Sequence, residues 1–442
     1  MSISRHVVKS TVVGALGGLL FGFDTAVISG TTQSLTTQFH LSPGMLGFTV
    51  ASALWGTVLG AITAGIPGQK YGRRDSLRVM ALFYVISAVG CAFAWNIESL
   101  IVFRFIGGLG IGGSSVLGPM YIAEISPPKW RGRLVGFFQV NIVIGILIAY
   151  VSNYLIGLLQ LGAIEWRWQL GVSAVPAALF LIMLFFIPRS PRWLTTQSRL
   201  DEAYSVLVLT GVEDPKAELD EIRRSLHLDL GGKQDSLWQR KYLLPIFLAW
   251  TVGMFCQLTG INAILYYLND IFSLAGASKM SGDLQAVAVG AMNLVATLLA
   301  MSVIDKFGRK KLLLFGTVGL AICLTVIGVL FWTHSHLNLL VWLLMIYIAL
   351  FAVSHGAVVW VYISEVFPNR VRAKGQSLGS SAHWITNAVI SLVFPIFAKS
   401  SGSAPFLFFA AMMVVDFFII LFYYPETAGV SLEKMQHVVG VD

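Results

Sequence analysis

The sequence has few charged residues and few cysteines for its length. Asp, Glu, Lys and Arg make up 12% of the 442 residues, whereas hydrophobic residues make up 56%. A water-soluble protein could not bury this much apolar surface, so the composition excludes an ordinary soluble domain. Cys91, Cys256 and Cys323 all lie in apolar stretches, without CxxC spacing or clustered histidines. We therefore expect free buried thiols and neither a disulfide framework nor a metal site.

The apolar residues are gathered into twelve stretches, each near the ~20 residues that a bilayer-spanning helix needs. We expect these helices to begin near residues 9, 45, 77, 98, 133, 167, 242, 284, 311, 338, 373 and 404. The sequence therefore predicts an all-α membrane protein with twelve transmembrane helices.

The basic residues indicate the orientation of these helices. If both termini are cytoplasmic, all but four of the 30 Lys and Arg residues lie on the cytoplasmic side. The exceptions are Arg104 inside a helix and Arg167, Lys279 and Lys399 on the outer side. Because cytoplasmic loops of membrane proteins carry an excess of Lys and Arg, we interpret the positive charge as a topology signal rather than a nucleic-acid site.

A long polar stretch separates six predicted helices from the other six. We expect an N-terminal six-helix bundle at 1–188, cytoplasmic linker helices at 189–241, a C-terminal six-helix bundle at 242–424 and a short cytoplasmic tail at 425–442. Apolar and charged residues alternate within the linker, which is typical of short amphipathic helices.

The two halves carry matching motifs in corresponding loops, which indicates an internal repeat. A glycine followed by basic residues comes after helices two and eight, and a Glu precedes an Arg by seven residues after helices four and ten. Such cations can pair with a carboxylate at the end of a neighbouring helix. We expect these contacts to tie the halves together on the inner face in one conformation; the alternative is that the cations only set topology. The candidate gating residues are Arg73, Arg74, Glu124, Arg131, Asp305, Arg309, Glu365 and Arg372.

Asp24 lies within the first apolar segment, where a carboxylate is costly unless it pairs or lines a path for ions or substrate. Fifteen residues from Lys9 place Asp24 about 22 Å into a hydrocarbon core about 30 Å thick, at 1.5 Å per helical residue. Arg104 lies at a similar depth, because helix four enters from the outside near Ser99. We therefore predict that Asp24 and Arg104 pair, either as a proton-coupling pair or as a purely structural one.

Several motifs together resemble the sugar porter family of the major facilitator superfamily. They are residues 17–25 (GGLLFGFDT), Arg104, residues 257–262 (QLTGIN) and residues 425–427 (PET). That family contains bacterial proton-coupled monosaccharide symporters and facilitative glucose carriers, and the first motif is especially similar to that of the D-xylose–proton symporters. The resemblance covers essentially the whole chain and implies the major facilitator fold of two six-helix bundles.

The resemblance also implies a sugar site. Uncharged amides suit sugar hydroxyls, which need both donors and acceptors, and flat aromatic rings suit the C–H faces of a sugar. A single Asn or Gln in such a helix more often joins helices than binds a ligand, and a single Trp is usually interfacial or packed. The expected substrate-binding residues are Phe21, Gln139, Cys256, Gln257, Asn262, Asn293, Trp360, His383, Trp384 and Asn387.

Some positions depart from the family pattern or have two interpretations. Cys256 stands where the family commonly has Gln, His383 where it has Asn or Gln, and Arg189 where it has Glu. Tyr266 and Tyr267 fit an outer gate, although an interfacial aromatic belt explains them almost as well.

Two enzyme-like patterns lack the structural context that they need. GxGxxG at 108–113 lies inside an apolar helix without a preceding strand, and GxSxG at 375–379 has no strand–turn context or plausible triad. Glycine-mediated helix packing is the better interpretation, and we expect no enzymatic activity.

Three functions therefore compete. The leading one is proton-coupled uptake of a monosaccharide, a hexose such as glucose or xylose, by alternating access. A facilitative carrier is the second, and a non-transporting sugar sensor, which would be expected to have a long signalling tail, is the third; about eighteen residues follow Tyr424. We expect a monomer in the cell membrane, with a proton as coupling ion and no cofactor.

Overall fold

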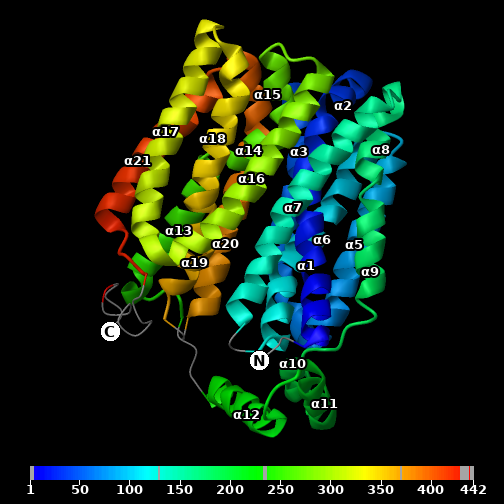
Figure 1. Ribbon diagram of the computed structural model, residues 1–442, viewed down its shortest axis with the longest axis vertical. Helices are drawn as coiled ribbons and strands as arrows, with labels where there is room; N and C mark the ends of the chain where they lie inside the picture. Colours follow the sequence, from blue (N-terminus) through cyan, green and yellow to red (C-terminus); the bar gives the residue numbers. More distant parts are fainter. Residues whose placement is uncertain (1–3, 128–129, 232–235, 369–370, 429–437, 439–442) are drawn as a thin grey trace. The chain divides into compact units, whose positions relative to one another are not determined.

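The computed structural model describes residues 4–127, 130–231, 236–368, 371–428 and 438 (Figure 1). Every regular element among these residues is helical. Twelve helical segments are long and apolar enough to cross a membrane, as predicted, and each begins within a few residues of its expected start. They are Arg5–Gly30, Pro43–Lys70, Arg73–Ala92, Ile97–Ile125, Arg131–Leu158, Gly162–Met183, Arg240–Tyr266, Lys279–Ser302, Arg309–Thr333, Leu337–Glu365, Lys374–Ser400 and Ala404–Tyr423.

Several of these spans consist of more than one helix. The first part of the chain contains α1 (Arg5–Val27), η1 (Ile28–Gly30), α2 (Thr32–Phe39), α3 (Pro43–Thr63), α4 (Gly65–Lys70), α5 (Arg73–Ala92), α6 (Ile97–Ile125), α7 (Arg131–Leu158), η2 (Gly162–Ile164), α8 (Glu165–Gly171), α9 (Ala174–Met183), α10 (Pro191–Thr196), α11 (Leu200–Thr210) and α12 (Pro215–Gly231). The second part contains η3 (Arg240–Tyr242), α13 (Leu243–Leu258), α14 (Ile261–Tyr266), α15 (Leu268–Leu274), α16 (Lys279–Phe307), α17 (Arg309–Thr333), η4 (Leu337–Leu339), α18 (Leu340–Val353), α19 (His355–Glu365), α20 (Arg372–Ser400) and α21 (Ala404–Tyr423).

The chain divides into two compact units that differ from the predicted halves. Unit 1 comprises Met1–Asp24, Trp55–Ala149 and Arg167–Lys233, and unit 2 comprises Thr25–Leu54, Tyr150–Trp166 and Gln234–Asp442. The C-terminal end of the first spanning segment therefore groups with the C-terminal helices. Sequence periodicity could not reveal this grouping, because it depends on contacts between residues far apart in the chain.

Unit 1 is built on close packing of helices through glycine. A Cβ on Gly22 of α1 would lie 1.8 Å from the carbonyl oxygen of Ile142 on α7, and one on Gly112 of α6 would lie 2.1 Å from that of Thr57 on α3. Only glycine fits such contacts, so the packing interpretation of the glycine-rich segment 108–113 is confirmed. The linker forms α10, α11 and α12 beside the N-terminal end of α1 (Figure 1).

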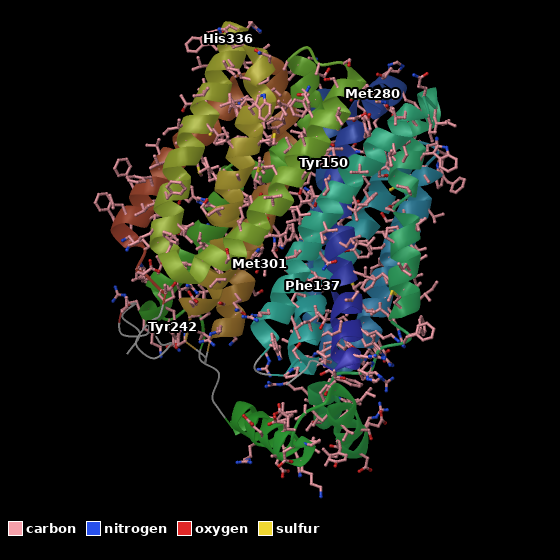
Figure 2. All side chains as sticks on the ribbon, viewed as in Figure 1. Phe137, Tyr150, Tyr242, Met280, Met301 and His336 are labelled. Carbon is pink, nitrogen blue, oxygen red and sulfur yellow. The ribbon has the colours of Figure 1, made fainter. Side chains whose placement is uncertain are left out.

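Unit 2 contains two interrupted spans. Helix seven breaks between α13 and α14, where Gly260 has φ 85°, and helix ten breaks between α18 and α19, where Ser354 has φ −110° and ψ −96°. Figure 2 shows Tyr242 and His336 near opposite ends of this unit's helices. Breaks of this kind are typical of transporter helices that line a binding site.

Candidate functional site

Asp24 and Arg104 meet inside unit 1. Arg104 Nη2 of α6 lies 3.6 Å from Asp24 Oδ2 of α1, and the side-chain exposures are 3% for Arg104 and 28% for Asp24. Arg104 Nε is buried and has no hydrogen-bond partner among the described residues. The predicted pairing is confirmed, and the carboxylate is its more accessible member.

Unit 1 also contains hydrogen-bonded hydroxyl groups and two residues that were predicted to contact the sugar. Tyr84 Oη lies 2.9 Å from Ser114 Oγ and donates to the Gly17 carbonyl oxygen at 3.3 Å. Phe21 on α1 and Gln139 on α7 are each half-buried in this unit. Both side chains therefore retain some exposed surface.

The predicted residues of helices seven and eleven form a connected hydrogen-bond network in unit 2. Gln257 Nε2 of α13 donates to His383 Nε2 of α20 at 2.8 Å, while Gln257 Oε1 accepts from Asn262 Nδ2 of α14 at 3.0 Å. Gln257 is 2% exposed and His383 is 7% exposed. The helix break at Gly260 lets the chain place Gln257 and Asn262 within hydrogen-bonding distance of each other. These residues form a polar cluster inside an apolar bundle.

Aromatic rings lie beside this cluster. The Trp360 ring of α19 lies 4.8 Å from the His383 ring, and Trp384 lies edge-on to His383 at 5.2 Å. Trp360 is 38% exposed, whereas Trp384 is 4% exposed. Trp360 therefore offers the freer surface to a sugar. Asn293 of α16 and Cys256 of α13 are buried at 7% and 2% exposure.

The two predicted gate tyrosines are buried rather than interfacial. Tyr266 and Tyr267 are 3% and 1% exposed. Asn387 Nδ2 donates to Tyr266 Oη at 3.1 Å, and Tyr267 Oη donates to the Ser391 carbonyl oxygen at 2.9 Å. Tyr267 also stacks on Phe394, with ring centroids 5.1 Å apart. An aromatic-belt interpretation does not account for these contacts, because belt residues lie at the membrane–water interface.

The repeated loop motifs form ion pairs, but within each half. Arg73 Nη2 lies 2.8 Å from Glu124 Oε1, and Arg309 Nη2 lies 3.1 Å from Glu365 Oε1. We expected such contacts to join the two halves in one conformation, whereas in this structure both pairs lie inside their own half. The reason is local: each arginine follows a glycine at positive φ and begins the helix next to the one that ends in the glutamate.

The remaining loop residues have different partners from those expected. Arg131 Nε donates to the Ala123 carbonyl oxygen in the last turn of α6, and Arg372 Nε donates to the Phe367 carbonyl oxygen, two residues beyond the end of α19. Arg74 Nε lies 3.1 Å from Asp75 Oδ1. The side chain of Asp305 lies outside the described residues.

Sequence reasoning missed four polar contacts. Asp75 binds Arg78 Nη1 at 2.7 Å and Arg189 Nη2 at 3.0 Å, which gives the unusual Arg189 a partner. Glu165 pairs with Lys279, and His355 pairs with Asp416. Asp416 stood out as a charge in an apolar span, but its partner, which is 61 residues away, could not be found without knowing which helix faces it.

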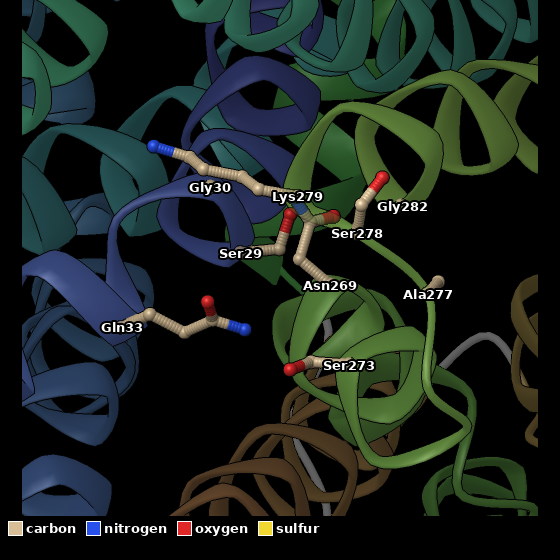
Figure 3. A pocket seen from close by; sticks show the side chains of 9 residues that line it. All are labelled: Ser29, Gly30, Gln33, Asn269, Ser273, Ala277, Ser278, Lys279 and Gly282. Atoms are coloured by element: carbon tan, nitrogen blue, oxygen red, sulfur yellow. The ribbon is translucent and has the colours of Figure 1, made fainter.

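A small pocket lies in unit 2, and none of the residues that line it is a predicted sugar contact (Figure 3). Its wall comes from η1, α2, α15 and the start of α16, and is formed by Ser29, Gly30, Gln33, Asn269, Ser273, Ala277, Ser278, Lys279 and Gly282. Beside it on α15, burial raises the pKa of the Asp270 carboxyl to about 6, although hydrogen bonds with Thr32 and Gln33 act in the opposite direction. No group of His, Cys, Asp and Glu that could hold a metal ion occurs among the described residues.

Buried charges and convergent hydrogen-bonding groups inside apolar helices are typical of proteins that move polar solutes through membranes. Together with the twelve spans, they define a multi-pass membrane transporter. The sequence profile described as "Sugar (and other) transporter" matches residues 10–439. The chain belongs to this sugar transporter family and has the major facilitator fold.

The chain is similar to known sugar transporters over nearly its full length. The chain is 36% identical to the D-xylose-proton symporter of Escherichia coli K12, with 98% of this chain and 96% of that protein covered. It is 35% identical to the glucose transport protein of Synechocystis, with 98% and 97% covered. The inward-open structure of the xylose transporter XylE from E. coli matches with a TM-score of 0.87 and 35% identity over 98% of this chain and 99% of that one.

Proposed function

We propose that this protein imports a neutral monosaccharide, a hexose such as glucose or xylose, together with a proton by alternating access. The observation that carries the proposal is the buried pair of Arg104 and Asp24, 3.6 Å apart within apolar helices. The names of similar proteins, a D-xylose-proton symporter and a glucose transport protein, support the same substrate class.

The proton is carried by Asp24. Burial favours the protonated form of a carboxylate and a neighbouring guanidinium favours the ionised form, so changing the access of water or the distance to Arg104 moves a proton on or off. Asp24 takes up a proton from the outside as it releases Arg104, and loses it inside when the pair re-forms. The Asp24 side chain is 28% exposed, so water can reach its carboxylate, whereas the Arg104 side chain is buried.

The sugar binds to the amides and aromatic rings of the site described above. Gln257 already hydrogen-bonds to both His383 and Asn262, so these donors and acceptors can exchange their partners for sugar hydroxyls without leaving buried polar groups unsatisfied. Trp360 provides the ring surface for a C–H face of the sugar. Phe21 and Gln139, both in unit 1, are further candidate sugar contacts.

Gating uses contacts on both faces. Tyr266 and Tyr267, which bond to helix eleven, close the outer side. The pairs Arg73–Glu124 and Arg309–Glu365 brace the inner loops of their own halves and keep each bundle rigid as it moves. We further propose a monomeric carrier with both termini cytoplasmic, as the distribution of Lys and Arg supports, and with a proton as the coupling ion.

Uptake of labelled glucose, galactose and xylose into proteoliposomes, with and without an imposed inward proton gradient, tests this proposal. A symporter accumulates its sugar above the equilibrium level only when the gradient is present. A facilitative carrier equilibrates the sugar and ignores the gradient, and a sensor binds sugar without transporting it. Either of the last two results would overturn the proposal.

A further inference from the structure

Two titratable side chains inside the C-terminal helices have no part in the coupling scheme. His355 Nε2 donates to Asp416 Oδ2 at 2.9 Å, and their side chains are 1% and 2% exposed. They belong to α19 and α21, both in unit 2. Because polar and ionisable groups in a membrane bundle are costly, a pair buried this deeply calls for a specific role.

The pair is located at the break in helix ten. His355 is the first residue of α19, directly after Ser354, whose backbone leaves the helical region. Ser354 Oγ donates to the Leu350 carbonyl oxygen at 2.6 Å, and a Cβ on Gly316 of α17 would lie 2.1 Å from that same oxygen, Ser354 Oγ. The break is therefore closely packed on one side. A helix that starts at such a break loses continuous backbone hydrogen bonding to α18, so its direction depends on side-chain contacts.

The inner part of helix ten carries a predicted sugar contact. Trp360 lies on α19 five residues beyond His355, and its ring lies 4.8 Å from that of His383. His383 in turn accepts a hydrogen bond from Gln257 at 2.8 Å. A tilt of α19 about the break would move Trp360 away from this network.

We propose that His355 and Asp416 are a positioning pair that anchors α19 to α21 and so holds Trp360 in place against the sugar-binding network. The pair acts through Trp360 and does not itself touch the sugar. This inference rests on the proposed sugar site. It gives the buried Asp416 a role that its position in an apolar span did not reveal.

The test compares four variants of the pair and one control variant with the wild type. Asp416→Leu and His355→Leu each remove one partner, whereas the double variant removes both and leaves no lone buried ionisable group that would impair folding. The exchange variant, His355→Asp with Asp416→His, restores a pair in the reverse order. Thr251→Val is the matched control, because it removes another buried side-chain hydrogen bond of the same bundle, 2.9 Å long, to Tyr424.

Two measurements are made on each purified variant. The first is KM and Vmax for sugar uptake in proteoliposomes, and the second is amide hydrogen exchange of the segment His355–Glu365. We expect KM to rise about tenfold in both single variants and in the double Leu variant, with Vmax per transporter changed less than about twofold. Exchange of α19 should become faster, while exchange of α13 stays unchanged. The exchange variant should return KM to within about twofold of the wild type.

A purely structural pair predicts something different. If the double Leu variant folds and keeps both its KM and the slow hydrogen exchange of α19, the positioning role is overturned. Faster hydrogen exchange of α19 together with an unchanged KM would overturn only the proposed link to the sugar site, and the anchoring role would stand. If the wild type transports no monosaccharide, the proposed function fails, yet hydrogen exchange still tests the anchor, and unchanged exchange in the double variant refutes it.

Discussion

Individual residues of the C-terminal helices maintain a hydrogen-bonding site despite unusual residue types. His383 stands where an amide is usual for the family, and it accepts a hydrogen bond from Gln257 at 2.8 Å. The amide nitrogen of Gln257 therefore donates to His383, and its amide oxygen accepts from Asn262. This arrangement fixes which way the Gln257 amide faces, and a fixed amide is what selective recognition of a sugar hydroxyl requires.

His383→Ala should weaken sugar binding because it frees Gln257 to rotate and removes a ring that packs on Trp360. We expect KM for uptake to rise about tenfold, consistent with loss of roughly 1.4 kcal/mol. His383→Gln should restore most of the affinity. Ser381→Ala on the same helix, whose hydroxyl donates to the Ser377 carbonyl oxygen, serves as the control. Equal KM values for His383→Ala and the control would contradict this role.

Asp270 should make the stability of unit 2 depend on pH. Burial raises the pKa of its carboxyl to about 6, so the folded state holds the proton more tightly than the unfolded chain does. The resulting stability is fully present below the ordinary value of 3.8 and is lost as pH rises through about 6. The apparent Tm of the purified protein should therefore fall over this range, and Asp270→Asn should flatten the fall. Asp220→Asn removes an exposed carboxylate and should leave the fall in Tm unchanged. If Asp270→Asn and the wild type showed the same dependence of Tm on pH, the role given to Asp270 would be refuted.

At the scale of elements, the interrupted helices determine where the site lies. The break in helix seven separates α13 from α14 and allows side chains five residues apart, Gln257 and Asn262, to bond directly. The break in helix ten separates α18 from α19 and gives Trp360 an orientation independent of the outer half of that helix. Continuous helices would place these groups differently.

Gly260→Ala tests the helix-seven break. At φ 85° an alanine is strained by about 1 kcal/mol, and its Cβ would also lie 2.4 Å from the Phe409 ring. Gly276→Ala is a matched control, because Gly276 has φ 86° and a Cβ there meets nothing within 4 Å. Both variants should lose thermal stability, but only Gly260→Ala should raise KM severalfold, since Gln257 and Asn262 flank the break. An equal rise in KM for both would contradict this account.

The sequence predicted the helices better than their interruptions. Long apolar stretches require bilayer-spanning helices, which is why all twelve segments could be located. The depth of Asp24 and Arg104 follows from the rise per residue, so their pairing was also predictable. The break at Ser354 has no proline and follows from packing against Gly316, which only the structure shows.

Pairings between distant helices were the least predictable part. Which side of a helix faces which neighbour depends on its rotation about its own axis, and rotation is set by the packing of the whole bundle. For this reason Asp416 was recognised as unusual while His355 was not connected with it. Arg73 and Arg309 each pair with a glutamate at the end of a neighbouring helix, as the motif suggested, but repeated spacing does not tell whether such a pair lies within one half or joins the two.

At the scale of the whole molecule, the account depends on one exchangeable proton. Uptake above equilibrium requires that sugar movement and proton movement share a single conformational cycle. In the proposed mechanism, the step that links them is the protonation of Asp24, which alters its attraction to Arg104. The rest of the architecture, including the braced inner loops and the buried gate tyrosines, would serve a facilitative carrier equally well.

The most direct measurement follows sugar and proton together in proteoliposomes containing either the wild type or Asp24→Asn, with Asp220→Asn as the exposed-carboxylate control. The wild type and the control should accumulate sugar under an inward proton gradient and should move protons when sugar is added. Asp24→Asn should lose both while it still exchanges labelled sugar for unlabelled sugar, because its site remains permanently neutral. Sugar-driven proton uptake that persists in Asp24→Asn would contradict the central claim.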